Sequence, residues 1–586
     1  MKNQRRVLKG APLAALCLGA LTLSACGSNG GSDAGVVNPA TGAGAGSGTP
    51  LPQLSAATGA KLGSCTDLAA RISYPNTSIA SATSVAAGGL TVGGKPVPAH
   101  CLVKGSMFQR VSPVDGQNYA IGFEMRLPVD WNGRFFYQGN GGLDGAVVTA
   151  TGDVGGGGQL DNALNQGFAV ISSDAGHGAA TPLFGIDPQA RLDYGYQASG
   201  KLAPMAKSVI QTAYGKGPDR SYFGGCSNGG RHTMVAAARY PEQFDGYLVG
   251  DPGFRLPLAA IANIAGGQAY AALATTPGDL GTGFTAAERA LVSNAVLDKC
   301  DALDGVKDGL VQDTGACQAA FSLERDVPTC GAQGRDGTCL SGAQKTAIGQ
   351  LFSGALKSDK TRIYASFPYD AGLGTSGWAF WKFFSPLQLD SGAVAMIWKV
   401  PPVDPATFNG ANFALTSNVD TLLSQVAATN ATYQESALSF MLPPNLTDFS
   451  KVKNRGAKMM LYHGTSDPIF SSDDTKNWYE NLRAANGGDA GNFARYFQVP
   501  GMNHCSGGPA TDQFDMLTPL VAWVEKGQAP ASVKAGARGA GNAGGANADL
   551  PSTWAATRTR PLCPYPQVAR YNGSGSIEDA ANFSCK

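Results

Sequence analysis

The pentapeptide Gly225-Cys226-Ser227-Asn228-Gly229 has the G-x-S-x-G pattern in which a serine serves as a nucleophile. Small residues on each side let such a serine occupy a strained strand-to-helix turn with its hydroxyl exposed. The pattern also occurs by chance in glycine-rich chains, and this chain has 79 glycines. Its setting favours catalysis, because residues 221–223 are β-prone, residues 230–240 suit a helix, and Pro241 would end that helix.

The order of residues along the chain selects the partners of Ser227. In α/β-hydrolases the serine is followed by an acid and then by a histidine. Only His463 and His504 lie far enough beyond the serine; the other histidines are His100, His177 and His232.

Asp467 follows an apolar stretch that is predicted to be a buried strand, so it is the favoured acid, and only His504 follows it. Asp473 and Asp474 are alternative acids, but they lie at the start of a predicted helix. His463 is then expected to be a structural residue at the strand end.

These residues suit acyl transfer. His504 would take the proton of the Ser227 hydroxyl and return it to the leaving alcohol, while Asp467 would orient the imidazole. The tetrahedral oxyanion needs two amide donors, of which one would be the backbone N–H of Asn228. The second is expected in the glycine-rich loop 139–142, which follows the apolar stretch 135–138 and would otherwise be an ordinary turn.

Each of the two central catalytic residues has a cysteine as its neighbour. Cys226 precedes Ser227, and Cys505 follows His504. A disulfide between these cysteines would join the nucleophile to the base across almost half of the chain.

Several motifs resemble those of the tannase/feruloyl esterase family. The matching stretches are residues 187–193 (DPQARLD), 225–231 (GCSNGGR), 499–508 (VPGMNHCSGG) and 558–566 (RTRPLCPYP). The resemblance extends from about residue 60 to the C-terminus. It implies an α/β-hydrolase fold with a large inserted lid domain, a cysteine-flanked triad and esters of aromatic acids as substrates. It also implies that Gly142 is the second oxyanion donor.

The cysteine content is consistent with export. The chain has 12 cysteines, and ten remain once Cys17 and Cys26 of the leader are set aside. Their connectivity does not follow from the sequence alone. The family resemblance implies the pairs Cys65–Cys101, Cys226–Cys505, Cys300–Cys317, Cys330–Cys339 and Cys563–Cys585.

The N-terminus resembles a bacterial lipoprotein signal. A basic start precedes the apolar stretch 11–23, which is too short to span a bilayer as a mature helix. Residues 23–26 (LSAC) resemble a lipobox, with Cys26 as the lipidated residue. Gly27 at the next position favours the outer membrane, without indicating a periplasmic or a cell-surface side. An ordinary secretory signal with a chance cysteine is the alternative.

The 586 residues are too many for one minimal core. The net charge of +1 and the lack of a basic stripe give no support for nucleic-acid binding. We expect a signal peptide (1–25), a flexible tether (26–60), a first part of the catalytic domain (61–253), a lid domain (254–449) and a second part of the catalytic domain (450–586).

The segment 301–310 (DALDGVKDGL) has carboxylates at short intervals, with glycines that allow the backbone to turn. Hard oxygen ligands in this pattern suit Ca²⁺, although an acidic solvated turn is the common alternative. The family resemblance implies a structural calcium ion. Its ligands would be the side chains of Asp301, Asp304 and Asp308 and the backbone oxygens of Val306 and Leu310. We expect no organic cofactor.

Aromatic residues of the expected lid are candidates for the substrate pocket, although such runs are more often core. They are Trp378, Phe380, Trp381, Phe384 and Trp398. Family members that hydrolyse a terephthalate monoester bind its carboxylate with an arginine, and a phenylalanine follows four residues later. This chain has Leu389 and Ala393 at those positions, and Lys382 or Lys399 could supply only a point charge.

The sequence therefore predicts a serine carboxylic-ester hydrolase that acts on esters of aromatic acids of the feruloyl or galloyl type. Hydrolysis of mono(2-hydroxyethyl) terephthalate is the alternative within the same class. The alternative of another class is a non-catalytic surface lipoprotein that binds its ligand on a hydrolase fold, and Ser227, Asp467 and His504 together argue against it.

Overall fold

The structure is a computed structural model, and it describes residues 51–586. The expected signal peptide, Cys26 and the tether up to residue 50 lie outside the described residues. The last ten residues of the expected tether are described, and they differ from a free linker. Ala57 N donates to Glu525 Oε2 at 2.9 Å, and Thr58 N donates to Asp219 Oδ2 at 2.7 Å. These hydrogen bonds hold residues 51–60 against the two parts of the expected catalytic domain, residues 61–253 and 450–586, which we call the catalytic body.

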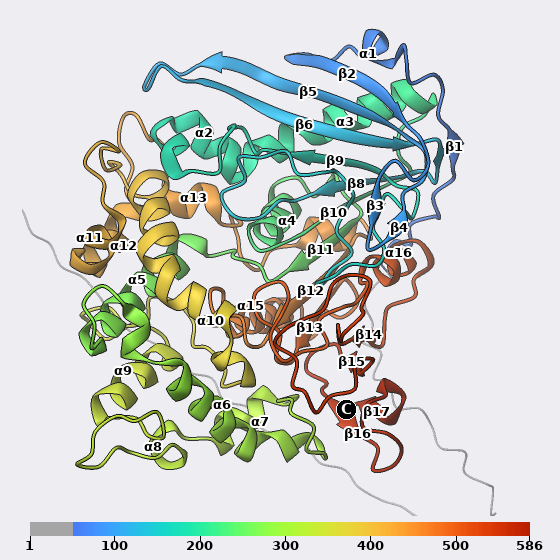
Figure 1. Cartoon of the computed structure of the whole chain (residues 1–586). Helices are drawn as coiled ribbons and strands as arrows, with labels where there is room; N and C mark the ends of the chain where they lie inside the picture. The colour runs from blue at the N-terminus through green and yellow to red at the C-terminus, as the bar shows by residue number, and fades with distance from the viewer. Residues whose placement is uncertain (1–50) are drawn as a thin grey trace, which may run out of the picture. The chain divides into compact units, whose positions relative to one another are not determined.

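A nine-stranded mixed sheet runs through the described residues in the order β13-β12-β11-β10-β8-β9-β6-β5-β2 (Figure 1). Neighbours from β13 to β9 pair in parallel, whereas β6, β5 and β2 extend the sheet in antiparallel pairs. The strands are β2 (Thr77–Val85), β5 (His100–Val111), β6 (Asn118–Pro128), β8 (Arg134–Gln138), β9 (Ala169–Ser173), β10 (Arg220–Cys226), β11 (Gly246–Gly250), β12 (Lys458–Gly464) and β13 (Ala494–Val499).

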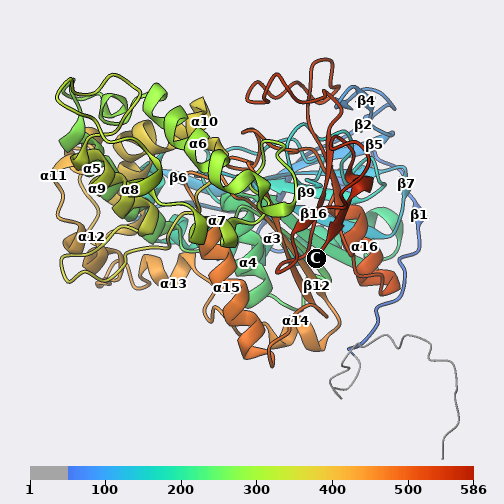
Figure 2. The same cartoon turned by 90° about the horizontal axis from the view of Figure 1, so that it is seen from below.

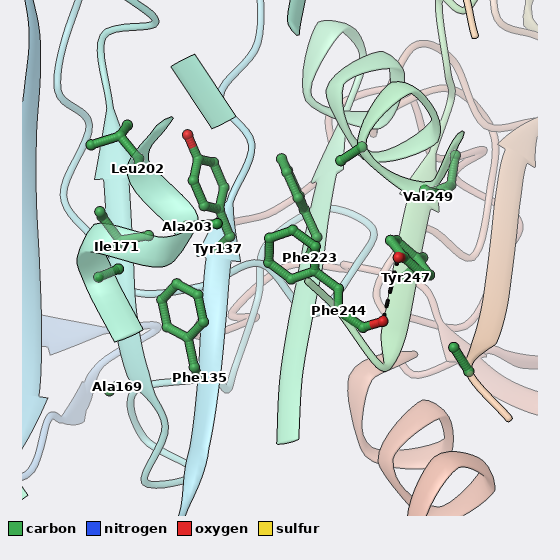
Figure 3. Packing of buried hydrophobic residues seen from close by; sticks show 14 of the residues in the cluster. Phe135, Tyr137, Ala169, Ile171, Leu202, Ala203, Phe223, Phe244, Tyr247 and Val249 are labelled. Atoms are coloured by element: carbon green, nitrogen blue, oxygen red, sulfur yellow. Dashed lines mark hydrogen bonds between the residues drawn. The ribbon is translucent and has the colours of Figure 1, made fainter. Parts of the chain in front are cut away.

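Most side chains of the parallel strands are apolar, as expected for strands whose sheet is covered by helices on both faces. Phe135 and Tyr137 of β8 face the side of Leu202 and Ala203 from α3 (Figure 3), whereas Phe136 belongs to the core on the other side. The first side is covered by α3 (Ala198–Tyr214), α4 (Asn228–Arg239) and α15 (Ser472–Ala485), and the second by α16 (Leu517–Lys526).

Four small two-stranded sheets and two short α-helices also belong to the catalytic body. The sheets are β1–β7 (Ala60–Lys61, Asp130–Trp131), β3–β4 (Thr91–Val92, Lys95–Pro96), β14–β15 (Val533–Gly536, Thr559–Leu562) and β16–β17 (Ala569–Tyr571, Phe583–Cys585). The helices are α1 (Leu68–Arg71) and α2 (Pro188–Leu192).

The chain between β11 and β12 is a helical insertion, which corresponds to the expected lid (residues 254–449). Figures 1 and 2 show its helices side by side next to the sheet. They are α5 (Leu256–Leu273), α6 (Ala286–Cys300), α7 (Thr314–Ala320), α8 (Leu323–Asp326), α9 (Gly342–Ser353), α10 (Ser376–Ala379), α11 (Gly410–Thr416), α12 (Val419–Val426) and α13 (Ala437–Met441), with α14 (Ser450–Asn454) leading into β12. Three π-helical turns follow α10: η6 (Phe380–Phe384), η7 (Pro386–Asp390) and η8 (Ala393–Trp398).

Helix α5 is long and apolar enough to cross a membrane by length and composition, but more than half of its 18-residue window is buried inside the protein. It contributes to two hydrophobic cores of the insertion. Residues 51–586 form one compact unit, so the insertion does not separate from the catalytic body.

Five disulfides occur in the described residues, and they join the same cysteines that the family resemblance pairs. They are Cys65–Cys101, Cys226–Cys505, Cys300–Cys317, Cys330–Cys339 and Cys563–Cys585.

Candidate active site

Ser227 lies in the sharp turn between β10 and α4, as its motif predicts. Its backbone is in the left-handed region, with φ 65° and ψ −127°, which a non-glycine residue adopts only under strain. The flanking glycines are required by close approach of the backbone. A Cβ atom at Gly225 or Gly229 would lie 2.3 Å from the carbonyl oxygen of Gly139. The G-x-S-x-G spacing therefore reflects the packing of this turn against the loop after β8.

Ser227, His504 and Asp467 form a continuous hydrogen-bonded series. His504 Nε2 lies 2.8 Å from Ser227 Oγ, and His504 Nδ1 lies 2.7 Å from Asp467 Oδ2. Asp467 is 3% exposed. Burial alone would raise the pKa of its carboxyl, but the imidazoles of His504 and His463 hold that pKa well below its ordinary value. The carboxylate therefore stays ionised beside the imidazole.

The loop after β12 fixes the second oxygen of Asp467. Its Oδ1 accepts hydrogen bonds from the backbone amides of Ile469 at 2.9 Å and Phe470 at 3.0 Å. His463 is fully buried, and its Nε2 lies 3.2 Å from Asp467 Oδ2 and 2.9 Å from the carbonyl oxygen of Phe470. Its Nδ1 lies 2.8 Å from Thr475 Oγ1. His463 thus has the structural position expected for it.

Asp251 is a buried carboxylate of the site that the sequence analysis did not identify. Its Oδ1 accepts from Gly464 N at 2.7 Å, and its Oδ2 accepts from Cys505 N at 2.5 Å. Burial raises the pKa of Asp251 to about 6, and the imidazole of His463 opposes this rise. Asp251 directly follows β11, at the sheet edge where β10 and β12 also end, and this position could have marked it as a candidate site residue.

The two expected oxyanion donors come from neighbouring loops. Asn228 is the first residue of α4, so its amide has no acceptor within the helix. Gly142 lies in the loop after β8 with a φ of 62°, and that loop packs on the serine turn. A Cβ atom at Gly141 would be 3.8 Å from Ser227 Cβ. The two segments are therefore adjacent at Ser227.

Comparison with known proteins identifies the family. A family model described as "Tannase and feruloyl esterase" matches residues 101–586. The chain belongs to this family. It is 41% identical over 532 residues to the mono(2-hydroxyethyl) terephthalate hydrolase of Piscinibacter sakaiensis, covering 84% of this chain and 86% of that protein. It is 29% identical over 491 residues to a probable feruloyl esterase B-1 of Neosartorya fischeri, covering 79% of this chain and 82% of the relative.

Solved structures of the family share the fold. The feruloyl esterase B of Aspergillus oryzae superposes with a TM-score of 0.70 at 25% identity, covering 89% of this chain and 99% of that one. The tannin acyl hydrolase of Aspergillus niger has a TM-score of 0.65 at 18% identity, covering 89% and 95% of the two chains. The α/β-hydrolase fold is therefore confirmed, and as a member of the tannase/feruloyl esterase family the protein is a carboxylic ester hydrolase.

The aromatic candidates from the insertion lie in different places. The ring of Trp381 meets the His504 ring edge to face, with centroids 5.2 Å apart, and the ring of Phe470 meets His504 in the same way. Trp378 and Trp398 are buried in the cores of the insertion. Phe380 and Phe384 are 43% and 49% exposed and stack on each other at 5.2 Å. Among these five candidates, only Trp381 has its ring against His504 in the described structure.

Leu389 and Ala393 occupy the positions where an arginine and a phenylalanine are expected for hydrolysis of a terephthalate monoester, and their solvent exposure differs. Leu389 is 41% exposed, whereas Ala393 is buried in the core around α5. Lys382 has its ammonium 4.0 Å from the centroid of the Phe367 ring and lines a small cavity together with Asp467. The Lys399 ammonium donates to the carbonyl oxygen of Pro401 at 2.6 Å.

The predicted calcium loop lies between α6 and α7, where Cys300–Cys317 closes it. Asp304 Oδ2 is buried without a hydrogen-bond partner, and burial together with the charges of Asp308 and Asp301 raises the pKa of Asp304 to about 7. A cation at this loop would satisfy that oxygen, so Asp304 fits the ion well.

The other two carboxylates of the loop are already engaged. Asp308 Oδ2 pairs with Arg560, and Asp301 Oδ1 accepts from Asp308 N at 2.8 Å. Within residues 51–586, the three side chains do not bring one oxygen each within 4.8 Å of one another. Coordination by all three would therefore require the loop to contract around the ion.

Proposed function

We propose that this protein hydrolyses esters of aromatic acids through a Ser227–His504–Asp467 triad and an acyl-enzyme. The observation that carries the proposal is the hydrogen-bonded series from Ser227 Oγ through His504 to Asp467, at 2.8 and 2.7 Å, on a strained strand-to-helix turn. Membership of an esterase family supports the same chemistry.

In the acylation step, His504 Nε2 takes the proton from Ser227 Oγ as the oxygen attacks the ester carbonyl. The ionised Asp467 orients the imidazole and stabilises the imidazolium that forms. The amides of Asn228 and Gly142 donate to the oxyanion of the tetrahedral intermediate. His504 then gives its proton to the leaving alcohol, and a water molecule hydrolyses the acyl-enzyme by the same steps.

The aromatic side chains at His504 favour an aromatic acyl group. Trp381 and Phe470 each present a ring to the imidazole at 5.2 Å, so two apolar surfaces adjoin the base. A planar acyl group at Ser227 would gain stacking or edge contacts from such walls. We infer a feruloyl or galloyl type of ester, in agreement with relatives named as feruloyl esterases.

Hydrolysis of mono(2-hydroxyethyl) terephthalate is the second candidate. It is favoured by 41% identity to a protein named for that activity. It is disfavoured by Leu389 and Ala393, since neither side chain can bind the free carboxylate of this substrate. We therefore rank it below the neutral phenolic esters.

Hydrolysis of a substrate panel by the mature protein and by Ser227→Ala tests the proposal. The panel holds methyl ferulate, methyl gallate, mono(2-hydroxyethyl) terephthalate and p-nitrophenyl acetate. We expect turnover of the two hydroxyaromatic esters and its loss in the variant. Preference for the terephthalate monoester would replace the first substrate class with the second. Absence of turnover on the whole panel would contradict the aromatic-ester proposal.

We also propose a structural calcium ion at the 301–310 loop, held by Asp301, Asp304 and Asp308 with the backbone oxygens of Val306 and Leu310. The unpartnered Asp304 Oδ2 supports it. The loop also connects the insertion to the C-terminal part of the chain, because Arg558 donates to the carbonyl oxygen of Asp308 at 2.6 Å. An ion here would stabilise that connection without entering the reaction.

The N-terminal motif supports the proposal of an outer-membrane lipoprotein with Cys26 as the lipidated residue. Radiolabelled palmitate and Cys26→Ser in the native host test it. We expect label in the wild-type protein and none in the variant, which should leave the membrane fraction. A wild-type protein without label would favour an ordinary secretory signal.

A further inference from the structure

A buried polar network connects the two segments that carry the expected oxyanion donors. What we infer from this network rests on the proposed function and extends that function. Gly142 belongs to the loop after β8, and Asn228 begins α4, so no covalent geometry fixes one amide relative to the other. A backbone hydrogen bond from Gly139 N to the carbonyl oxygen of Gly224, at 2.8 Å, joins the strands from which the two segments continue. Side chains add a further constraint to this backbone packing.

Asp144 provides a direct link between these segments. Its Oδ1 accepts a hydrogen bond from the side-chain amide of Asn228, Nδ2, at 2.5 Å. Asp144 follows Gly142 by two residues, and its own amide donates to the carbonyl oxygen of Gly141 at 3.1 Å, which closes the loop into a turn. The carboxylate thus connects the turn that carries Gly142 to the residue that carries the other amide.

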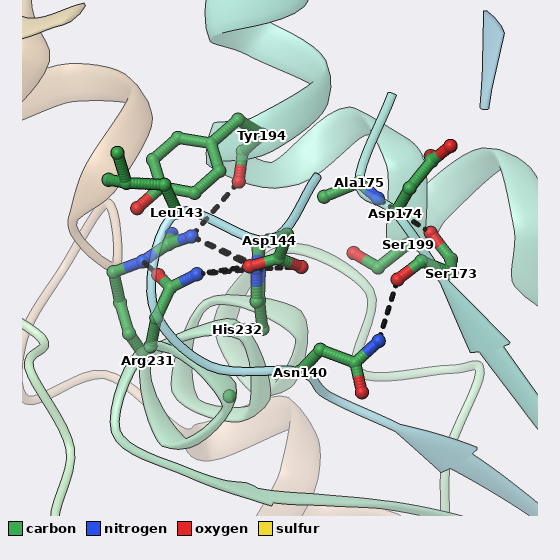
Figure 4. A network of polar contacts seen from close by, with 12 residues as sticks. Asn140, Leu143, Asp144, Ser173, Asp174, Ala175, Tyr194, Ser199, Arg231 and His232 are labelled. Atoms are coloured by element: carbon green, nitrogen blue, oxygen red, sulfur yellow. Dashed lines mark hydrogen bonds and ion pairs between the residues drawn. The ribbon is translucent and has the colours of Figure 1, made fainter. Parts of the chain in front are cut away.

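A second series of hydrogen bonds connects Asn228 to Gly142 through Arg231 and Tyr194. Arg231 Nε donates to Asn228 Oδ1 at 2.6 Å, and Arg231 Nη2 donates to the carbonyl oxygen of Tyr194 at 2.9 Å. The hydroxyl of Tyr194 donates to the carbonyl oxygen of Gly142 at 3.3 Å. Figure 4 shows Asp144, Tyr194, Arg231 and His232 gathered in this network. The side chain of Asn228 is therefore held at both of its ends.

The charges of the network are desolvated. Asp144, Arg231 and His232 are buried, and Asn228 is 1% exposed. Burial and the nearby positive charge of Arg231 lower the pKa of His232, so its imidazole is neutral and lies 3.2 Å from the Asp144 carboxylate. Polar interactions in such a site are strong and directional. They also hold Asp144 at a φ of 49°, in the left-handed region.

We propose that Asp144 is a positioning residue of the oxyanion hole, which acts by binding the side chain of Asn228. Asp144 does not contact the reacting atoms. Its effect passes through the amides of Gly142 and Asn228, whose spacing decides how well they bind the oxyanion. Small displacements of such donors are costly, because the stabilisation depends on preorganised geometry. A network that served stability alone would affect unfolding and leave turnover unchanged.

The test compares Asp144→Ala and Asn228→Ala, which retains the backbone amide, with Asp174→Asn as the matched control. Asp174 is as buried as Asp144, but it accepts from the amides of Gly122 and Gly176. The measurements are kcat and KM on methyl ferulate, the inhibition constant of an aryl trifluoromethyl ketone, and thermal unfolding. The ketone reports on the oxyanion hole because its serine adduct carries an oxyanion.

We expect kcat to fall about 10- to 100-fold in each alanine variant, with KM within about twofold and a parallel rise in the inhibition constant. The control should retain kcat and the inhibition constant. The double variant should lose no more than the larger single loss, because Asp144 acts through Asn228. Folded Asp144→Ala with unchanged kcat and inhibition constant would overturn the inference, as would fully independent losses in the double variant.

A different result would concern the proposed function itself. If Ser227→Ala retained the wild-type turnover, the triad proposal would fail and the inference would fall with it. If Ser227→Ala were inactive while Asp144→Ala retained full activity, only the role of Asp144 would be refuted.

Discussion

Cys226 and Cys505 form a disulfide that spans 279 residues of sequence and joins the residue before Ser227 to the residue after His504. Ser227 and His504 are thereby parts of one covalent unit, although one belongs to the turn after β10 and the other to the loop after β13. Asp251 supports the same unit, since its carboxylate accepts from the amide of Cys505. The contact between Ser227 and His504 is thus supported covalently as well as by packing.

Removal of this disulfide should reduce catalysis more than it reduces folding. For the double variant Cys226→Ala/Cys505→Ala we expect kcat to fall at least about tenfold at 25 °C, because a small drift of the base is costly. The protein should remain folded, since even a bond that closes so long a loop adds only roughly 5 kcal/mol to a large domain. Circular dichroism and kcat on methyl ferulate check this. The control Cys563→Ala/Cys585→Ala should lower the Tm and retain kcat.

The strands and helices of the site could be predicted because their signals are local. The apolar stretch before Ser227, the helix that ends before Pro241, and the strand before Asp467 all occur as predicted. Each depends on short-range properties, namely strand propensity, glycine spacing and the effect of proline on a helix. The order of serine, acid and histidine along the chain then selected the residues that the structure brings together.

The supporting residues could not be predicted because their roles depend on distant contacts. Asp251 binds amides more than 200 positions later, and Asp144 binds a side chain 84 positions away. Neither residue belongs to a motif. The aromatic run 378–384 illustrates the same limit. The spacing of its aromatic residues along the sequence does not show which ring faces His504, because part of the run forms a π-helical turn. Only Trp381 among the five candidates meets that ring.

Trp381→Ala should change the preference for the acyl group. The ring of Trp381 meets His504 at 5.2 Å and would form one wall for an aromatic acyl group. We expect kcat/KM on methyl ferulate to fall about tenfold, which corresponds to an aromatic contact of about 1.4 kcal/mol. The value on p-nitrophenyl acetate should change less than threefold. Phe384→Ala, which removes an exposed ring, is the control, and an equal effect on both esters would contradict the assignment.

Calcium removal should lower thermal stability more than it lowers turnover. We expect a chelator to reduce the Tm by several degrees and to leave kcat at 25 °C within about twofold, because an ion at 100 times its Kd adds about 2.7 kcal/mol. Asp304→Asn should abolish the response of the Tm to added calcium, whereas Asp298→Asn, an exposed carboxylate of α6, should retain it. A large loss of rate without a shift in Tm would indicate a catalytic ion instead.

Lys382→Met should stabilise the protein at neutral pH, and the gain should shrink in alkaline solution. Burial lowers the pKa of the Lys382 ammonium from 10.5 to about 8, and the charges of Asp467 and Asp390 oppose this only in part. Between pH 8 and 10.5 the unfolded chain holds a proton that the folded protein has lost, so the free energy of unfolding rises with pH across this window. Below pH 8 the charged lysine opposes folding by a constant amount.

Differential scanning calorimetry of the wild-type protein and Lys382→Met at pH 7 and pH 10 measures this effect. We expect the variant to be more stable at pH 7 by on the order of 1 kcal/mol, since one pKa unit corresponds to about 1.4 kcal/mol and partial exposure of the side chain weakens the effect. At pH 10, near the upper end of this window, only about a quarter of the difference should remain. Lys61→Met, whose ammonium is exposed beside Asp130, should show a smaller change between the two pH values. A variant that is less stable than the wild type at pH 7 would show that the Lys382 ammonium stabilises the fold, because its attraction to Asp467 and Asp390 would then outweigh the cost of its burial.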